Sequence, residues 1–97
     1  MIKVNSTNFQ LETQKRIVLY FQSYWCPACE SMNEVLLNVE KNNPEISIGQ
    51  VNSIESNDLV RKLKISAIPA LILCENGGMI KKRLGSMTEP EVLEFLK

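Results

Sequence analysis

A strongly apolar run leads directly into two closely spaced cysteines, and this junction limits the folds open to the chain more than any other feature. Residues 16–22 (RIVLYFQ) are rich in β-branched and aromatic types, which is typical of a buried strand. After Cys26-Pro27-Ala28-Cys29, apolar residues between Met32 and Val39 recur at the spacing of one helix face. We therefore expect a strand, a tight loop that carries the cysteines, and a helix, in that order.

The rest of the chain continues the alternation of strands and helices. Asn76-Gly77-Gly78 is a hairpin signal, Ser56 is placed to cap a helix, and Thr88 with Glu91 forms a capping box before a last helix. The other expected elements are an edge strand near residues 2–4, helices over 9–13 and 56–65, and strands over 46–51, 69–75 and 79–85. This order predicts an α/β fold with a parallel or mixed sheet covered by helices on both faces.

Size and charge exclude several classes of protein. The chain has 97 residues, so we expect one domain over residues 1–97, and its hydrophobic fraction of 44% is that of a globular protein. Eleven basic residues balance eleven acidic ones, which argues against binding to nucleic acid or to an anionic membrane. The cluster Lys81-Lys82-Arg83 is expected to keep a strand edge soluble. No apolar run has the length of a signal peptide or a membrane span, so we expect a cytoplasmic protein.

The histidine and cysteine counts narrow the possible chemistry. The chain has no histidine, which excludes Ser-His and Cys-His nucleophile sites and any zinc site that needs imidazole. Three cysteines are an odd number, so a framework made only of disulfides is not expected. A zinc site would have to combine Cys26, Cys29 and Cys74 with a carboxylate, and we expect no metal. Cys74 is expected to be a small buried apolar residue, with a second redox thiol as the alternative.

The position of the cysteine pair at a strand-to-helix junction favours a redox site over a structural pair. Cys26 would be the helix N-cap and Cys29 would lie in the first turn, so free backbone N–H groups and the positive end of the helix dipole face the first sulfur. Both effects lower the pKa of a cysteine, and the thiolate is the attacking species in disulfide exchange. Pro27 at the first helical position loses no hydrogen bond.

Three motifs in the same order resemble those of the thioredoxin family. They are IVLYFQSYWCPAC with Trp25 before the first cysteine, KISAIPALILCENGG with an Ile-Pro pair, and RLGSMTEPEVLEFL with Gly85. The resemblance runs from about residue 15 to the end of the chain. It implies a thioredoxin fold, in which a central mixed sheet of four to five strands is flanked by helices on both faces.

The resemblance also implies roles for individual residues. Cys26 would be the exposed nucleophile, and Cys29 would be the buried cysteine that resolves the mixed disulfide. Pro69 would be a cis-proline that faces the pair, and Ile68 would pair its backbone with an extended substrate peptide. The substrate-binding surface implied in this way comprises Trp25, Pro27, Ala67, Ile68, Pro69 and Gly85. The alternatives are simple packing for Trp25 and a backbone requirement for φ > 0 at Gly85.

By this resemblance the chain would be a thiol–disulfide oxidoreductase that acts on protein disulfides and binds no cofactor. It would work as a monomer and receive electrons from a flavin-dependent thioredoxin reductase. The residues also leave open a module of another class, a thioredoxin-like adaptor or chaperone that docks extended peptides with an idle cysteine pair.

Five positions depart from the usual pattern of the family. Pro27-Ala28 replaces Gly-Pro between the cysteines. Tyr20 stands where thioredoxins carry a buried Asp, and Gln50 stands where a Lys lies near it. Because a Tyr with its ordinary pKa near 10 is a poor base at neutral pH, we expect Cys29 to react more slowly. Glu34 replaces a helix-kinking proline, so we expect an unkinked helix.

Overall fold

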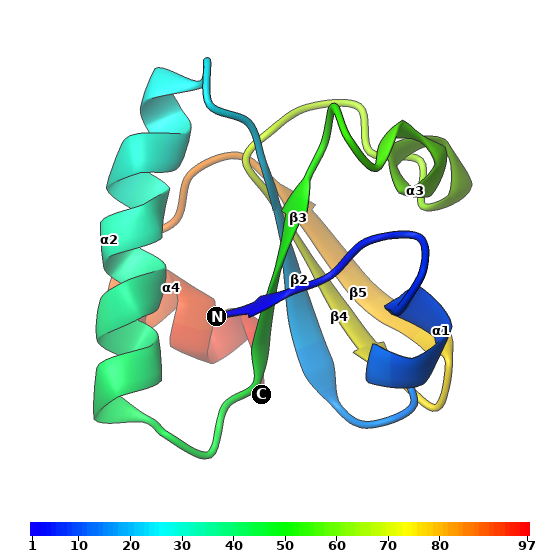
Figure 1. Ribbon diagram of the computed structural model, residues 1–97. Coiled ribbons are helices and arrows are strands. Elements are labelled where there is room, and N and C mark those ends of the chain that lie inside the picture. Colours follow the sequence, from blue (N-terminus) through cyan, green and yellow to red (C-terminus); the bar gives the residue numbers. More distant parts are fainter.

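A computed structural model describes residues 1–97, and its centre is a five-stranded mixed sheet (Figure 1). The strand order is β1-β3-β2-β4-β5, with bounds Ile2–Lys3, Ile48–Asn52, Ile17–Gln22, Ala70–Glu75 and Gly78–Leu84. Strands β1, β3 and β2 are mutually parallel, whereas β4 and β5 are antiparallel to their neighbours. The expected mixed sheet with β1 at one edge is confirmed. None of the helices combines the length and the hydrophobicity that a membrane span requires.

Four helices cover the two faces of the sheet, as the alternating pattern predicted. They are α1 (Phe9–Glu12), α2 (Pro27–Asn42), α3 (Asn57–Lys62) and α4 (Glu89–Phe95). Helices α2 and α4 lie on one face, and α1 and α3 lie on the other (Figure 1). Helix α2 is continuous over its 16 residues, in agreement with the absence of a proline at Glu34.

Strand β2 forms the centre of both hydrophobic cores because its side chains alternate between the two faces. All six of its residues are buried. Ile17, Leu19 and Phe21 pack beneath α1 and α3, whereas Val18 and Tyr20 pack beneath α2 and α4. The strand is therefore held on both faces and along both edges, and the loop that carries the cysteines begins where it ends.

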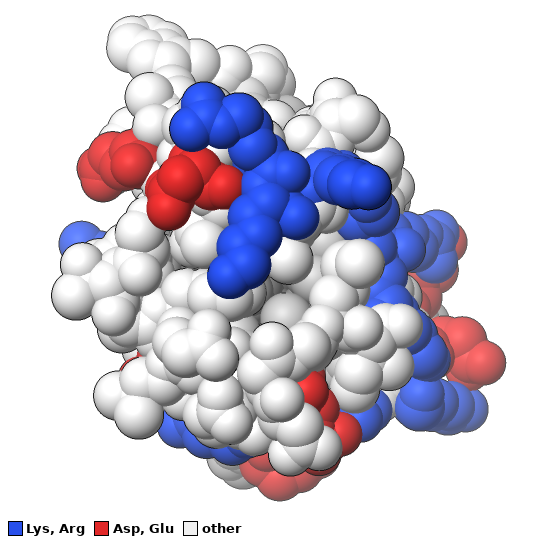
Figure 2. All heavy atoms as spheres, turned by 90° about the vertical axis from the view of Figure 1, so that its right-hand side faces the viewer, with Lys and Arg blue, Asp and Glu red and all other residues white.

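The edge strand β5 is exposed along its whole length, and it carries the basic cluster. Lys82 donates to the carbonyl oxygen of Lys64 at 2.9 Å, and Arg83 pairs with Glu91 at 2.9 Å. Figure 2 shows that Lys and Arg side chains run across this side of the molecule with acidic side chains among them. The cluster thus lies on an edge strand of the sheet, and its role in keeping that edge soluble stays a prediction.

The two helix caps expected from the sequence have different outcomes. Thr88 and Glu91 form the complete capping box of α4. Ser56 occupies the N-cap position of α3, but its hydroxyl accepts no bond from the helix, so the expected side-chain cap is wrong. Ser56 is instead buried, with 2% of its surface exposed.

Candidate active site

The cysteine pair lies where β2 passes into α2, as the sequence predicted. Cys26 is the N-cap residue in an extended conformation, and Pro27 occupies the first turn of the helix. The N–H of Cys29 donates to the carbonyl oxygen of Cys26 at 3.0 Å, which folds the two residues back toward each other. Their Cα atoms are 5.2 Å apart, and their sulfurs form a disulfide.

Burial divides the two cysteines into one accessible and one protected sulfur. Cys29 is 1% exposed, whereas Cys26 is partly exposed at the end of the helix. In the reduced form, an attacking thiolate at Cys26 is stabilised by the N–H groups and the dipole of the first turn of α2. This asymmetry suits an entry nucleophile at Cys26 and a resolving thiol at Cys29.

Tyr20 lies beneath the first turn of α2 and is bonded to it. Its hydroxyl donates to the carbonyl oxygen of Cys29 at 2.9 Å, and its side chain is fully buried. Burial raises the pKa of Tyr20 above its ordinary value. The phenol therefore stays protonated at physiological pH, and its basic form, the phenolate, is even less populated than in an exposed tyrosine. Gln50, which pairs with Tyr20 in the parallel register, is a neutral amide, so neither position supplies a carboxylate or an ammonium group.

Pro69 directly precedes β4 and is buried, and Gly85 directly follows β5. The peptide bond between Ile68 and Pro69 is cis, as the resemblance implied. The N–H of Gly85 donates to the carbonyl oxygen of Pro69 at 2.7 Å, which ties the end of β5 to the start of β4. Gly85 has φ +93°, so its backbone requirement is real, and a Cβ added there would meet no atom within 4 Å. The surface beside Gly85 is therefore open.

The aromatic residues before Cys26 project from the molecule. Trp25 is 86% exposed and Tyr24 is 77% exposed, so simple core packing does not account for either. On the other side of the pair, Ala67 is exposed and Ile68 is half-buried. The structure thus brings the exposed members of the expected docking surface to the end of the sheet that carries the cysteines.

Comparison with known proteins identifies the family. The profile of the thioredoxin family matches residues 1–97. The chain belongs to the thioredoxin family. A thioredoxin from Mycoplasmoides gallisepticum is 28% identical over 87 residues, which cover 90% of this chain and 87% of the relative. A thioredoxin from Chlamydia pneumoniae is 30% identical over 88% of this chain and 85% of the relative.

Among solved structures, the oxidised mitochondrial thioredoxin 3 of Saccharomyces cerevisiae superposes with a TM-score of 0.84 at 28% identity. The match covers 98% of this chain and 91% of the yeast chain. The thioredoxin fold expected from the sequence is therefore confirmed. Family membership and the intact cysteine pair together indicate a thiol–disulfide oxidoreductase.

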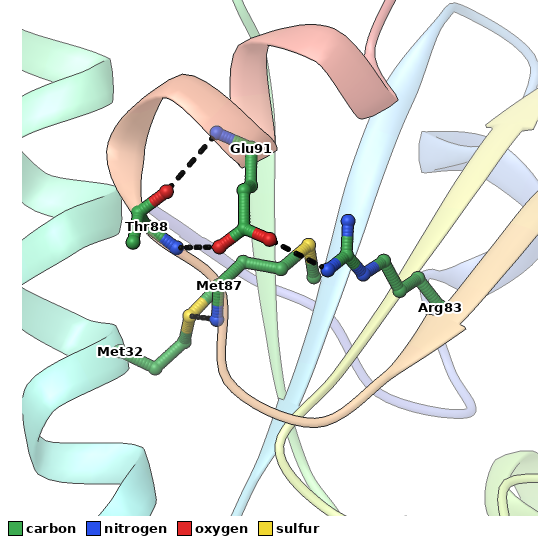
Figure 3. Close-up of polar contacts among 5 residues, drawn as sticks. All are labelled: Met32, Arg83, Met87, Thr88 and Glu91. Carbon is green, nitrogen blue, oxygen red and sulfur yellow. Dashed lines mark hydrogen bonds and ion pairs between the residues drawn. The ribbon is translucent and has the colours of Figure 1, made fainter.

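The connection between β5 and α4 is anchored to the active-site helix through a contact that the sequence did not predict. The backbone N–H of Met87 donates to the sulfur of Met32 at 3.4 Å, and both residues are buried (Figure 3). Beside this contact, the carboxylate of Glu91 accepts from the N–H of Thr88 and from Arg83, each at 2.9 Å. The Thr88 bond, followed by the Arg83 bond, holds the pKa of Glu91 below its ordinary range. The loop that carries Gly85 is therefore fixed at both ends.

A shallow apolar hollow continues the docking surface toward α3. Its volume is about 550 Å³, and it is lined by Val60, Ile65, Ala67 and Ile68 together with Ile54. Ile54 is 63% exposed, and no motif or spacing in the sequence had singled it out. Its place in a loop between a strand and a helix was the only available signal.

The third cysteine is far less reactive than the pair. Cys74 lies in β4 and is 1% exposed, as expected for a small apolar residue. Burial raises the pKa of its thiol from 9.0 to about 11. Cys74 therefore stays protonated at neutral pH, which removes it as a nucleophile in the resting fold.

Proposed function

We propose that this protein reduces or exchanges disulfide bonds in other proteins through the Cys26–Cys29 pair. The observation that carries the proposal is the joining of a partly exposed Cys26 at a helix N-terminus to a buried Cys29. We assign to the same surface an apolar rim that comprises the exposed Trp25 and Ala67 and the half-buried Ile68. Such a rim suits an extended polypeptide, because side chains of the peptide dock while its backbone pairs with Ile68.

The reaction has two exchange steps. The Cys26 thiolate attacks one sulfur of the substrate disulfide, which forms a mixed disulfide and releases the other substrate sulfur as a thiolate that takes a proton. The Cys29 thiolate then attacks the Cys26 sulfur and releases the second substrate sulfur. The substrate gains two electrons and two protons, and the enzyme is left with the Cys26–Cys29 disulfide.

Resolution by Cys29 should be slower than in thioredoxins that carry a buried Asp at the position of Tyr20. Before it attacks, Cys29 must lose a proton inside the protein, and Tyr20 is a neutral donor whose pKa is raised by burial. The proton acceptor is therefore water or the departing thiolate rather than a buried carboxylate. The rate of resolution should rise with pH through the pKa of the Cys29 thiol.

The family also supports a proposal about the electron donor. A flavin-dependent thioredoxin reductase would reopen the Cys26–Cys29 disulfide, with the protein acting as a monomer in a reducing, cytoplasmic compartment. The buried, protonated Cys74 is in keeping with such a compartment, where unpaired thiols persist. Purified reductase with NADPH should reduce the protein in a coupled assay that follows NADPH absorbance.

Insulin reduction separates the enzyme from the adaptor alternative. We expect turnover with the wild type and with Cys74→Ser, and none with Cys26→Ser. The adaptor would be established by two results together: the wild type shows no turnover, and the double variant Cys26→Ser/Cys29→Ser still binds peptide.

The reduction potential then fixes the direction of transfer. Potentials of related sites range from roughly −270 mV for reductants to −120 mV for oxidants. Equilibration of Cys74→Ser in glutathione or dithiothreitol buffers, followed by thiol counting, gives the value for the Cys26–Cys29 pair alone. A value near the reducing end supports protein-disulfide reduction, and one near the oxidising end supports disulfide formation or exchange.

A further inference from the structure

A polar cavity of about 370 Å³ lies at the carboxyl ends of the three parallel strands. The last residue of each of these strands lines it: Lys3 of β1, Gln22 of β2 and Asn52 of β3. In open α/β sheets, this end of parallel strands is where ligands commonly bind. The volume falls within the range of roughly 300–1,000 Å³ that is usual for small-molecule sites. Tyr24, two residues before Cys26, also contributes to the lining.

Two deeply buried polar side chains in this cavity have no partner within the protein. Gln22 is 6% exposed and Ser56 is 2% exposed, yet neither the carboxamide nor the hydroxyl forms a hydrogen bond. The one fully enclosed side-chain atom without a partner is Oδ1 of Asn33, which does not line the cavity. The polar atoms of Gln22 and Ser56 therefore keep their free surface toward the cavity. Because these atoms are accessible and form no bond within the protein, they are available to water or to a ligand.

Two asparagines present their NH₂ groups rather than their oxygens. Oδ1 of Asn52 accepts from the N–H groups of Ile54 and Glu55 at 2.9 and 3.0 Å. Oδ1 of Asn5 accepts from the N–H of Thr7 at 2.9 Å and from a second backbone N–H. These turns fix the orientation of both amides, so each retains two side-chain N–H donors. The cavity is consequently rich in donors for a carboxylate.

One free cation and one free anion complete the lining. Lys3 and Glu55 both line the cavity, and neither takes part in an ion pair. The nearby carboxylate of Asp58 is already engaged, because the hydroxyl of Ser6 donates to it at 2.6 Å. That bond also joins the loop after β1 to the first turn of α3, which holds two walls of the cavity together.

We propose that this cavity binds the zwitterionic end of an α-amino acid. Lys3 and the NH₂ groups of Asn5 and Asn52 receive the carboxylate, while Glu55 and Gln22 receive the ammonium group. Only two of the eleven lining residues are hydrophobic, so the ligand is polar rather than lipid-like. The same end group is found on a free amino acid and on a small disulfide such as glutathione disulfide. The site is separate from the thiol chemistry and does not depend on it.

Amide NMR of the oxidised protein tests the proposal with L-glutamine and glutathione disulfide as probes. We expect either probe, at millimolar concentrations, to shift the backbone amides of Gln22, Asn52 and Ser56. Shifts with glutathione disulfide alone would identify the small disulfide as the source, and shifts with glutamine would identify a free amino acid. N-acetyl-L-glutamine, which lacks the ammonium group, should bind at least about tenfold more weakly, as expected for a lost charged hydrogen bond.

Exposed variants keep the test independent of folding. Lys3→Met and Glu55→Gln should each weaken binding about tenfold. Lys41→Met and Glu45→Gln, which change exposed charges outside this cavity, should leave binding unchanged. Absence of shifts with both probes would show that the cavity holds only water and overturn the proposal. Equal binding of the acetylated probe, or no effect of Lys3→Met and Glu55→Gln, would overturn it as well.

Discussion

The hydroxyl of Tyr20 donates a hydrogen bond of 2.9 Å to the backbone carbonyl of Cys29. The side chain thereby fastens the first turn of α2 to the central strand of the sheet. Where the family pattern has a buried Asp, this chain has a neutral phenol whose pKa is raised by burial. Tyr20 thus contributes to the position of Cys29 rather than to the removal of its proton.

Replacement of Tyr20 by Phe should affect stability and leave the chemistry intact. The variant removes one hydrogen bond and keeps the ring, so we expect a loss of about 1 kcal/mol in the free energy of unfolding. The rate of mixed-disulfide resolution should show the same pH profile as the wild type. Stopped-flow measurement across the pH range checks this, and a shifted profile in Tyr20→Phe would show that the hydroxyl handles protons.

Cys74 should make the fold sensitive to alkali. Its pKa is raised from 9.0 to about 11 in the fold, so the unfolded chain releases this proton first as the pH rises. The contribution of Cys74 to the free energy of unfolding is therefore complete below pH 9 and is lost between pH 9 and 11, and it amounts to about 3 kcal/mol. Urea unfolding of the oxidised protein against pH measures it.

Cys74→Ala is the control for that measurement, because it lacks the titrating group. The fall in stability between pH 9 and 10 should disappear in this variant. The fall above pH 10, the ordinary pKa of tyrosine, is caused by Tyr20 and should remain. Rapid alkylation of Cys74 in the native protein at neutral pH would contradict the burial on which the prediction rests.

Trp25 should matter for protein substrates and not for folding. Because the side chain is 86% exposed, Trp25→Ala should change the free energy of unfolding by no more than about 0.5 kcal/mol. We expect KM for reduction of insulin to rise several-fold and the rate with a small aromatic disulfide to stay the same. An equal loss with both substrates would place the effect on Cys26 rather than on docking.

Met32→Leu should loosen the loop that carries Gly85. Leucine fills nearly the same volume but cannot accept the bond from the N–H of Met87, so the stability cost should stay below about 1.5 kcal/mol. Hydrogen exchange of the Met87 amide should become faster. Met87→Leu is the matched control, since it keeps both the backbone N–H and the sulfur of Met32. Similar exchange rates in the two variants would show that the sulfur is not a significant acceptor.

Gly85→Ala tests backbone strain without a steric clash. The position has φ +93° and open space around a new Cβ, so we expect a loss of about 1 kcal/mol from the backbone alone. Gly78→Ala, in β5 with no positive φ, should be neutral or slightly stabilising. Thermal unfolding of both variants measures the two changes in stability. Equal changes would show that the positive φ at Gly85 is not the cause of the loss.

Most of the fold could be predicted because periodicity reports burial directly. Each signal that succeeded arises from residues close together in the sequence. These signals are the apolar run of β2, the helical spacing between Met32 and Val39, and the Thr88–Glu91 capping box. The prediction for Ser56 was only partly right. Its position before α3 was predictable from the sequence, but whether its hydroxyl bonds to the helix depends on tertiary packing. Local patterns thus located the elements better than they described individual polar groups.

The features that the sequence did not predict all join distant segments. The bond from Met87 to Met32 joins the loop before α4 to helix α2, and the hydrogen bond from Tyr20 to Cys29 depends on how α2 lies on the sheet. The polar cavity arises only because the ends of β1, β2 and β3 meet. Such contacts are set by tertiary packing, and a single sequence gives no spacing rule for them.

The Cys26–Cys29 bond closes one of the smallest loops a disulfide can close, with a sequence separation of 3. The entropy that a crosslink removes from the unfolded chain grows with loop length, so this one contributes only about 2 kcal/mol on that model. The two cores on either side of β2 do not include this bond. We therefore expect the fold to persist when this disulfide is reduced, because the bond adds little to the stability of the two cores.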